Sequence, residues 1–407
     1  MNSNYVHRKW NTLFIDLGIV VVRSNAMIFK NIKNIWLFGL ILLLLNSCYS
    51  NQTSKTLGGI EEMSILEEVK ERKWLNCGVN GNLRGFSYAK LSEIDMTKID
   101  NDSNIPNNNI LQEIGKSTVG FDVDICRAIA AAIFDDPNAV RYRFLDTQER
   151  FEELSSKKID VLSRTTTWTL ERDVSIGIEF APIVFYDGQG ILVQKNSKVK
   201  SLNDLNVKVI CVQTETTTQK NLEDEKKKRN LTFQIKPLQK EKDVYRLYEK
   251  GECQAVTSDR SQLAANLNSL KNPDEHIILS ETLSKEPLAP AVIDSDLQWV
   301  EIVRWIIFAL MEAEELGINQ NNLEQMKASK DPKIIRFLGL EATGDSIGSR
   351  LDLEPDYVQR IIRHVGNYGE IYDRNLGPNS STPIERGLNN LWNNPKHRGL
   401  IYSPPFR

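Results

Sequence analysis

Histidine is scarce in this chain, and so are the short motifs that mark common catalytic and metal sites. Its 407 residues include only four histidines, which lie far apart at His7, His276, His364 and His397. Zinc ligands normally recur at short, regular spacings, and these four do not. A P-loop and a C-x-x-C pair are absent, and "GQG" at 188–190 lacks the rest of a dinucleotide fingerprint. We therefore expect no metal, no cofactor and no enzymatic activity.

Long apolar runs are missing too. The run at residues 35–45 has eleven residues, whereas a membrane-spanning helix needs about 20. Because this run follows Lys30 and Lys33, it fits the hydrophobic region of a secretory signal peptide. We expect residues 1–48 to form a signal region, and a start at Met27 would give that region a normal length. The remainder of the chain would then be exported.

The end of this region resembles the lipobox of bacterial lipoproteins. In "LNSC" at 45–48, a leucine stands three residues before Cys48 and the small Ser47 directly precedes it. This pattern predicts lipidation of Cys48, so that a lipid anchor would be the only attachment to the membrane. Asn46 is unusual in a lipobox, and a plain signal peptide cleaved nearby is the alternative.

Positive charge is not concentrated in the body of the protein. The whole chain has a formal net charge of −3. The first 48 residues hold five basic residues and one acidic residue, so their removal leaves 46 basic and 53 acidic residues, or −7. Because nucleic-acid-binding domains carry a basic patch or stripe, we exclude nucleic acid as a partner.

Strands and helices alternate in two successive blocks. The first contains a helical pattern at 120–134 and a strand pattern at 141–147, and the second begins with a strand at 207–213. Such alternation predicts α/β sheets with parallel strands. From a buried core helix at 297–317 onward, the pattern is mostly helical.

Hydroxyl side chains gather at the end of one predicted strand, in "SRTTTWTLERD" at 163–173. If residues 161–167 are extended, the two-residue period of a strand places Thr165 and Thr167 on the same side. Thr169 can cap a helix that contains Arg172. This corner combines hydroxyls, free backbone N–H groups and a guanidinium, which are donors for a carboxylate. Trp168 should pack behind the corner, with an aromatic wall for the ligand as the weaker alternative.

Two further strand ends carry complementary groups. "QTETTTQ" at 213–219 again places hydroxyls, among them Thr217, before a helix. "QAVTSD" at 254–259 ends in Asp259, a candidate partner for an ammonium group. Each feature alone is more simply a helix cap or a surface ion pair. Together they describe a receptor for the zwitterionic head of a free amino acid, because open α/β sheets bind ligands at the carboxyl ends of strands.

The chain closely resembles the periplasmic solute-binding proteins of polar and general L-amino-acid ABC transporters. The motifs that carry this resemblance lie within about residues 74–407 and read "CGVNGNLRGFS", "GFDVDICRAIAAAIF", "IDVLSRTTTWTLERD", "FYDGQG", "ICVQTETTTQ", "SKEPLAPAV" and "GNYGEIYDRNLG". The resemblance implies an α/β, two-lobed type II periplasmic-binding-protein fold with a helical C-terminal extension. It also implies capture of free L-amino acids by a periplasmic monomer and their delivery to an ABC transporter membrane permease.

The resemblance further implies lobes and site residues. Lobe 1 would comprise 58–190 plus 292–407 and lobe 2 would comprise 191–291, with hinge crossings at 186–190 and 284–292. Thr165, Thr167, Arg172 and Thr217 would bind the substrate α-carboxylate, and Asp259 would bind its α-ammonium. The side-chain pocket would be lined by Asn80, Leu83 and Phe86.

Export makes the remaining cysteines candidates for disulfide bonds. Four cysteines allow three pairings, and two lobes would make pairing within each lobe the simplest: Cys77 with Cys126, and Cys211 with Cys253. Buried free thiols are an equally good interpretation of the sequence.

Two departures from the family pattern put the ligand's identity in doubt. Glu215 stands where a glycine is usual, near the carboxylate-binding helix start, and residues 88–118 are longer than the family norm. A carboxylate facing a carboxylate would cost affinity. The alternatives from other classes are an enzyme on the same fold, such as a prephenate or arogenate dehydratase, and a sensory amino-acid receptor.

Overall fold

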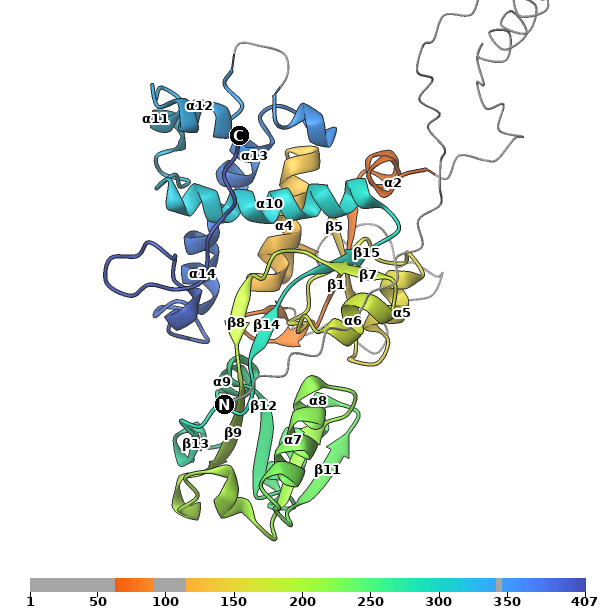
Figure 1. Cartoon of the computed structure of the whole chain (residues 1–407), viewed down its shortest axis with the longest axis vertical. Coiled ribbons are helices and arrows are strands. Elements are labelled where there is room, and N and C mark those ends of the chain that lie inside the picture. Colours follow the sequence, from red (N-terminus) through yellow and green to blue (C-terminus); the bar gives the residue numbers. More distant parts are fainter. Residues whose placement is uncertain (1–62, 91–114, 342–345) are drawn as a thin grey trace, which may run out of the picture. The chain divides into compact units, whose positions relative to one another are not determined.

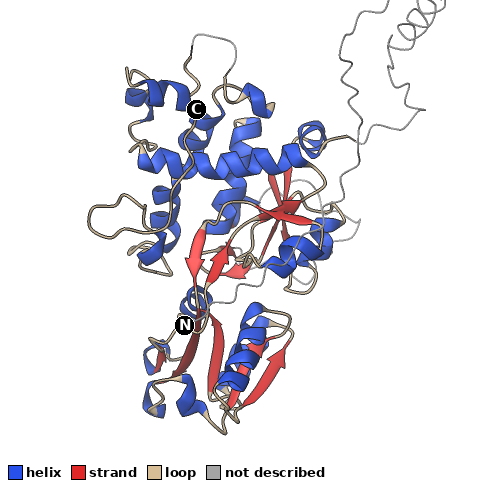
Figure 2. Ribbon diagram, viewed as in Figure 1, coloured by secondary structure: helices blue, strands red, loops and turns tan. Residues whose placement is uncertain are grey.

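The computed structural model describes residues 63–90, 115–341 and 346–407. Within these ranges two five-stranded sheets are the main features (Figure 1), and helices flank both (Figure 2). We call the part built on the first sheet lobe 1 and the part built on the second sheet lobe 2. The signal region, Cys48 and most of the 88–118 insertion lie outside the described residues.

The sheet of lobe 1 has the strand order β5-β1-β6-β15-β7. β1 is parallel to β5 and β6, whereas β15 is antiparallel to β6 and β7. Its strands are β1 (Leu75–Val79), β5 (Val140–Phe144), β6 (Val161–Leu162), β7 (Ile178–Phe180) and β15 (Ala291–Ile293). A small three-stranded sheet beside it contains β2 (Asn82–Leu83), β3 (Ser87–Ala89) and β4 (Thr118–Val119).

Helix α4 (Phe121–Phe134) covers lobe 1 and matches the predicted helix closely. It begins after Gly120, carries Asp122 and Asp124 in its first turn, and is buried along nearly its whole length. Acidic residues near a helix N-terminus interact favourably with its dipole. The other helices that precede the sheet of lobe 2 in the sequence are α2 (Ile65–Arg72), α5 (Arg150–Ser155) and α6 (Leu170–Ser175).

The sheet of lobe 2 has the order β11-β10-β12-β9-β13. β10 is parallel to β11 and β12, and β9 is antiparallel to β12 and β13. The strands are β9 (Gln189–Gln194), β10 (Val209–Gln213), β11 (Gln234–Leu238), β12 (Ala255–Asp259) and β13 (His276–Ile278). The helices are α7 (Thr217–Lys228), α8 (Glu241–Glu249) and α9 (Arg260–Leu267).

Two antiparallel strands run between the sheets, β8 (Phe185–Asp187) and β14 (Glu286–Leu288) (Figure 1). They overlap the two segments that the resemblance assigned to hinge crossings, 186–190 and 284–292. The expected α/β fold with two lobes, each a sheet flanked by helices, is therefore present. The lobe boundaries in sequence stay a prediction.

The C-terminal part packs on lobe 1 as a group of helices. Its helices are α10 (Leu297–Glu315), α11 (Leu323–Met326), α12 (Pro332–Phe337), α13 (Tyr357–His364) and α14 (Tyr368–Leu376). α10, α13 and α14 all contact α4, and α10 also contacts α13 and α14. The tail also reaches the ribbon between the lobes, because Asn389 exchanges two hydrogen bonds with the backbone of Tyr186. Short 3-10 helices are η3 (Lys195–Ser197), η4 (Leu202–Leu205), η5 (Pro273–Glu275), η6 (Ser349–Leu351) and η7 (Gly387–Asn389).

Each lobe contains one disulfide bond. Cys77 of β1 is bonded to Cys126 of α4, and Cys211 of β10 is bonded to Cys253. The Cα atoms are 6.4 Å and 5.7 Å apart, within the usual range for a disulfide. The structure therefore has the pairing within lobes rather than free thiols.

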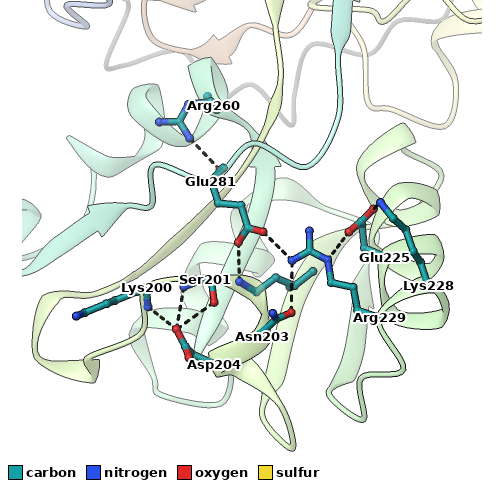
Figure 3. A network of polar contacts seen from close by, with 10 residues as sticks. Lys200, Ser201, Asn203, Asp204, Glu225, Lys228, Arg229, Arg260 and Glu281 are labelled. Atoms are coloured by element: carbon teal, nitrogen blue, oxygen red, sulfur yellow. Dashed lines mark hydrogen bonds and ion pairs between the residues drawn. The ribbon is translucent and has the colours of Figure 1, made fainter.

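A polar network holds the loops of lobe 2 (Figure 3). The Glu281 carboxylate accepts hydrogen bonds from the backbone N–H of Leu202 and from Arg229 Nη1, both at 2.7 Å. Arg229 also pairs with Glu225 at 2.6 Å. The hydrogen bond to Glu281, followed by that to Glu225, raises the pKa of Arg229. Because Glu281 precedes β14, this network ties α7 and η4 to the start of the ribbon between the lobes.

No helix in residues 63–90, 115–341 or 346–407 is long and apolar enough to cross a bilayer. The same ranges contain no cluster of three or more histidine, cysteine, aspartate or glutamate side chains that could hold a metal ion.

Candidate functional site

A polar cavity lies where the strand ends of the two lobes meet. Six of the eight residues predicted from the sequence for substrate binding line it: Asn80, Thr165, Thr167, Arg172, Thr217 and Asp259. The first four come from lobe 1 and the last two from lobe 2. The three strand-end corners identified in the sequence therefore converge on one cavity.

Leu83 and Phe86 lie elsewhere, in the hydrophobic core of lobe 1. Each is 1% exposed, and neither lines the cavity. Phe86 packs edge to face against Phe121 and Phe185, with ring centroids 6.3 Å and 5.5 Å away. The expectation that these two side chains face the ligand does not fit this placement, because apolar side chains in this turn gain more by joining the aromatic core.

The segment between β6 and α6 is more bent than the sequence suggested. β6 ends at Leu162, and Thr165 has a φ of 39°, so the two-residue period of a strand does not extend to Thr167. Thr165 and Thr167 nevertheless both reach the cavity. The Thr166 hydroxyl turns away and donates to the carbonyl of Arg164.

Two other residues of this corner have the roles expected of them. The Thr169 hydroxyl oxygen accepts a hydrogen bond from the backbone N–H of Arg172 at 3.3 Å, which makes it the N-cap of α6. Trp168 stacks on Phe180 with ring centroids 5.7 Å apart. It packs behind the corner and does not line the cavity.

Arg172 is fixed in place by its own corner. Its Nη1 donates to the carbonyl oxygen of Thr167 at 2.8 Å, which aims the guanidinium along the cavity wall. Burial lowers the pKa of Arg172, while the Glu286 and Asp259 carboxylates act in the opposite direction. Because the pKa of arginine is normally above about 12, Arg172 stays charged in this buried position and can bind a carboxylate with two parallel hydrogen bonds.

Glu286 connects the two lobes beside the cavity, and the sequence analysis did not identify it. Its Oε2 accepts hydrogen bonds from the hydroxyls of Thr167 at 2.7 Å and Thr217 at 2.9 Å, one from each lobe. Its Oε1 accepts from Asn221 and Ser284 at 2.8 Å and 2.5 Å. A hydroxyl has one proton, so in this arrangement Thr167 and Thr217 offer the ligand their oxygen lone pairs.

Asp259 is 4% exposed at the end of β12 and accepts a hydrogen bond from Gln262 Nε2 at 2.8 Å. Burial, then the nearby Asp187 and Glu286 carboxylates, raise its pKa well above the ordinary value, and Gln262 and Arg172 oppose this shift. Burial also raises the pKa of Asp187 to about 6. Such a cluster of carboxylates attracts a cationic group.

Comparison with known proteins identifies the family of this chain. The model of the bacterial extracellular solute-binding proteins, family 3, matches residues 98–324. The chain belongs to this family. The general L-amino acid-binding periplasmic protein AapJ of Rhizobium johnstonii is 44% identical over 344 residues, which cover 84% of this chain and 93% of that protein.

Two further relatives span most of this solute-binding protein. The glutamate/glutamine/aspartate/asparagine-binding protein BztA of Rhodobacter capsulatus is 39% identical, over 86% of this chain and 96% of its own length. A solved structure of a periplasmic binding protein from Brucella ovis with glutathione bound is 41% identical. It has a TM-score of 0.75 and covers 85% of this chain and all of that chain. Proteins of this family are periplasmic.

Glu215, the unusual residue near the start of α7, does not line the cavity of this family member. Its φ is 59°, a left-handed conformation that glycine adopts more readily. The side chain is exposed and accepts a hydrogen bond from Gln148 Nε2 of lobe 1 at 3.3 Å. Glu215 therefore turns towards solvent and the other lobe, away from the position at which it would face a ligand carboxylate.

Two arginines of the cavity were missed by sequence reasoning, Arg150 and Arg164. Arg164 donates to the carbonyl of Leu145 at 2.8 Å and to the Thr147 hydroxyl at 3.3 Å. Arg150 is the first residue of α5. Arg164 belongs to the hydroxyl-rich stretch at 163–173, where the sequence analysis assigned the cationic role to Arg172 alone. Arg150 belongs to a stretch that reads as an ordinary amphipathic helix, and no motif signals that its side chain points inward.

Residues 344–348 read G-x-S-x-G, a pattern of serine hydrolases that our sequence reasoning overlooked. In those enzymes the serine stands exposed at a strand-to-helix turn. Ser346 is instead 6% exposed. Its hydroxyl oxygen accepts a hydrogen bond at 3.2 Å from the backbone N–H of Ser349, the first residue of η6. Its contacts are those of a turn cap.

Proposed function

We propose that this protein captures a free L-amino acid between its two lobes and delivers it to an ABC transporter permease. The observation that carries the proposal is that Arg172 of lobe 1 and Asp259 of lobe 2 line the same buried polar cavity. A guanidinium and a carboxylate on opposite walls match the α-carboxylate and α-ammonium of a zwitterion. The names of AapJ and BztA, which describe amino-acid-binding proteins, support the same ligand class.

The hydroxyls complete the site for the head group. Arg172, with the N-terminus of α7, supplies donors for the α-carboxylate. Because Thr167 and Thr217 already donate to Glu286, their oxygens accept from the α-ammonium that pairs with Asp259. This refines the roles expected from the resemblance, in which both hydroxyls donate to the carboxylate. Thr165 and Asn80 face the ligand from lobe 1.

Binding works by closure in this proposal. The moving bodies are residues 58–190 plus 292–407 and residues 191–291, and the β8–β14 ribbon is the hinge. Only the closed form contacts both ends of the ligand, so the ligand selects it. The closed monomer then docks on the membrane permease. The range of amino acids is set by the part of the cavity beyond the head group.

Export and anchoring complete the proposal. The signal region within residues 1–48 directs the chain out of the cytoplasm, and lipidated Cys48 holds the protein at the membrane. Both features lie outside the described residues, and the support is the lipobox-like "LNSC". Mass spectrometry of the mature protein purified from membranes tests this, because an unmodified N-terminus that begins away from residue 48 would contradict it.

A binding experiment tests the function directly. Purified protein is screened for thermal stabilisation by the twenty amino acids, because a ligand at 100 times its Kd stabilises the native state by about 2.7 kcal/mol. Arg172→Met and Asp259→Asn should each weaken binding by at least about a hundredfold, the cost of leaving a buried charge unpaired. Arg246→Met, which removes an exposed pair with Asp243 on α8, is the control. Stabilisation by none of the twenty would refute the proposal.

Catalysis is the competing function, and we propose that the protein has none. A dehydratase on this fold would convert its substrate, whereas a binding protein returns its ligand unchanged. Incubating the purified protein with prephenate, arogenate and each bound amino acid, followed by product analysis, separates the two. A sensory receptor would differ only in its partner, so co-purification with a permease distinguishes the transporter subunit.

A further inference from the structure

Arg150 lies in the cavity, but in the proposed binding mode neither the α-carboxylate nor the α-ammonium of an amino acid pairs with its guanidinium. Its side chain lines the cavity, and the residue is only 4% exposed. Its Nε is buried and has no hydrogen-bond partner within the described part of the chain. The guanidinium lies over the ring of Phe151, 4.7 Å from its centroid. A buried guanidinium with an unpaired donor is costly unless something else binds it.

Arg164, the other arginine that sequence reasoning missed in this cavity, has a structural role. Arg164 is also buried, but it donates to a backbone carbonyl and to the Thr147 hydroxyl. Burial lowers the pKa of Arg164 as well, but the charges of Glu241, Asp146 and Asp122 act in the opposite direction and favour its cationic form. Arg164 is therefore held by the protein itself.

The charges around Arg150 are mostly of its own sign. Burial, and then the positive charges of Arg164 and Arg172, lower the pKa of Arg150 well below its usual value, and Asp259 is the opposing charge. A bound zwitterion pairs its ammonium with Asp259 and its carboxylate with Arg172, and it adds no net charge. It therefore leaves Arg150 without a negative partner and engages Asp259, the carboxylate that opposes the lowering of the Arg150 pKa.

We propose that Arg150 binds a second carboxylate of the ligand, so that the site favours amino acids with two carboxylates over neutral ones of the same shape. This inference rests on the proposed function, because it assumes that Arg172 and Asp259 hold the head group. The second carboxylate has two sources, the acidic side chain of glutamate or aspartate and the terminal carboxylate of a small γ-glutamyl peptide. A planar guanidinium suits either, since it binds carboxylates with two parallel hydrogen bonds.

The test compares a charged ligand with its neutral counterpart. L-glutamate and L-glutamine have nearly the same shape, and calorimetry measures both against the wild type, Arg150→Met and Arg150→Lys. The wild type should bind glutamate at least about tenfold more tightly than glutamine. Arg150→Met should weaken glutamate binding about a hundredfold, the usual effect of removing one partner of a buried charge pair. It should change glutamine binding by less than about threefold, and Arg150→Lys should restore part of the preference for glutamate.

The controls separate this inference from the function on which it rests. Arg246→Met removes an exposed arginine outside the cavity and should leave both affinities unchanged. Retained glutamine binding shows that Arg150→Met is folded and that the head-group site works. If the wild type prefers glutamine, or if Arg150→Met loses both ligands equally, the second-carboxylate site is refuted while amino-acid binding stands. If no amino acid binds the wild type, the proposed function itself fails. γ-Glutamylglycine binding more tightly than glutamate would identify the peptide as the source.

Discussion

Ligand affinity should rise with pH, because Asp259 carries a raised pKa in the ligand-free protein. Below that pKa the ligand-free carboxyl is protonated, whereas pairing with an ammonium requires the carboxylate. Binding then releases a proton. By linkage, the association constant increases up to tenfold for each pH unit and levels off once the pH exceeds the pKa of the ligand-free form. One pH unit is equivalent to about 1.4 kcal/mol of binding free energy.

Calorimetry between about pH 5 and pH 8, in buffers of different ionisation enthalpy, measures both the affinity and the number of protons released. We expect that number to be highest at the acidic end of the range and to fall as the pH rises through the pKa of Asp259. Asp259→Asn keeps the size of the side chain and an oxygen that can accept from Gln262. It should remove the release of this proton and lower the affinity by at least about a hundredfold.

The titration of Asp187 must be distinguished from that of Asp259. The pKa of Asp187 is about 6, raised by burial and lowered by hydrogen bonds from Ser261 and Gly188, and its charge is one of the causes of the shift at Asp259. In Asp187→Asn, the pKa of Asp259 should fall, and the rise in affinity should move to lower pH. An affinity that does not depend on pH in the wild type, or proton release that persists in Asp259→Asn, would refute the assignment of Asp259 to the ammonium.

Three further predictions concern residues outside the head-group pair. Glu286→Ala removes the shared acceptor of two hydroxyls from opposite lobes and should weaken binding at least about tenfold in calorimetry, since hydrogen bonds to charged groups contribute about 1.5–3 kcal/mol each; unchanged affinity would contradict this. Glu215→Gly relieves a left-handed φ at the loss of an exposed contact with Gln148, so the protein should be as stable or more so by up to about 1 kcal/mol, and affinity should change by less than about threefold. A large loss of binding would mean that Glu215 touches the ligand. Arg229→Met should lower the free energy of unfolding by about 1–3 kcal/mol, measured by denaturant titration, because Glu281 loses its cationic partner; an unchanged midpoint would show that the network adds nothing.

The sequence predicted most of the fold because its elements carry strong local patterns. The helix expected at 120–134 is α4, and the strands expected at 207–213 and 254–259 are β10 and β12, each within about two residues. Hydrophobic periodicity and turn residues are local properties, so one chain suffices to read them. The 163–167 stretch was less predictable, because the left-handed φ of Thr165 depends on packing around the corner.

Part of the site depended on contacts that no local pattern encodes. The convergence of Arg172 and Asp259 followed from their positions at strand ends, since ligands of α/β sheets bind there. Arg150, by contrast, begins a short helix whose sequence fits an exposed turn equally well, and only the three-dimensional arrangement turns its side chain inward. Leu83 and Phe86 were expected in the cavity but lie in the core. The sequence cannot separate these two positions, because a hydrophobic side chain near a site can pack into the core equally well.

The contacts between the lobes suggest how much of closure the ligand must supply. The ion pair of Lys220 with Glu171 joins α7 to α6 at 2.5 Å, but its side chains are 63% and 71% exposed. Exposed pairs contribute about 0–1 kcal/mol. The contact of Gln148 with Glu215 is also exposed, so the buried acceptor Glu286 is the strongest polar link between the lobes that does not involve the ligand. Two further hydrogen bonds between the lobes are long, from Asn80 to Glu241 at 3.4 Å and from Asn268 to the carbonyl oxygen of Ser381 at 3.3 Å. Because the other links named here are exposed or long, we expect the closed form of the free protein to have only a small advantage of its own. Affinity for each amino acid should then follow how completely it pairs with the charged groups of both walls.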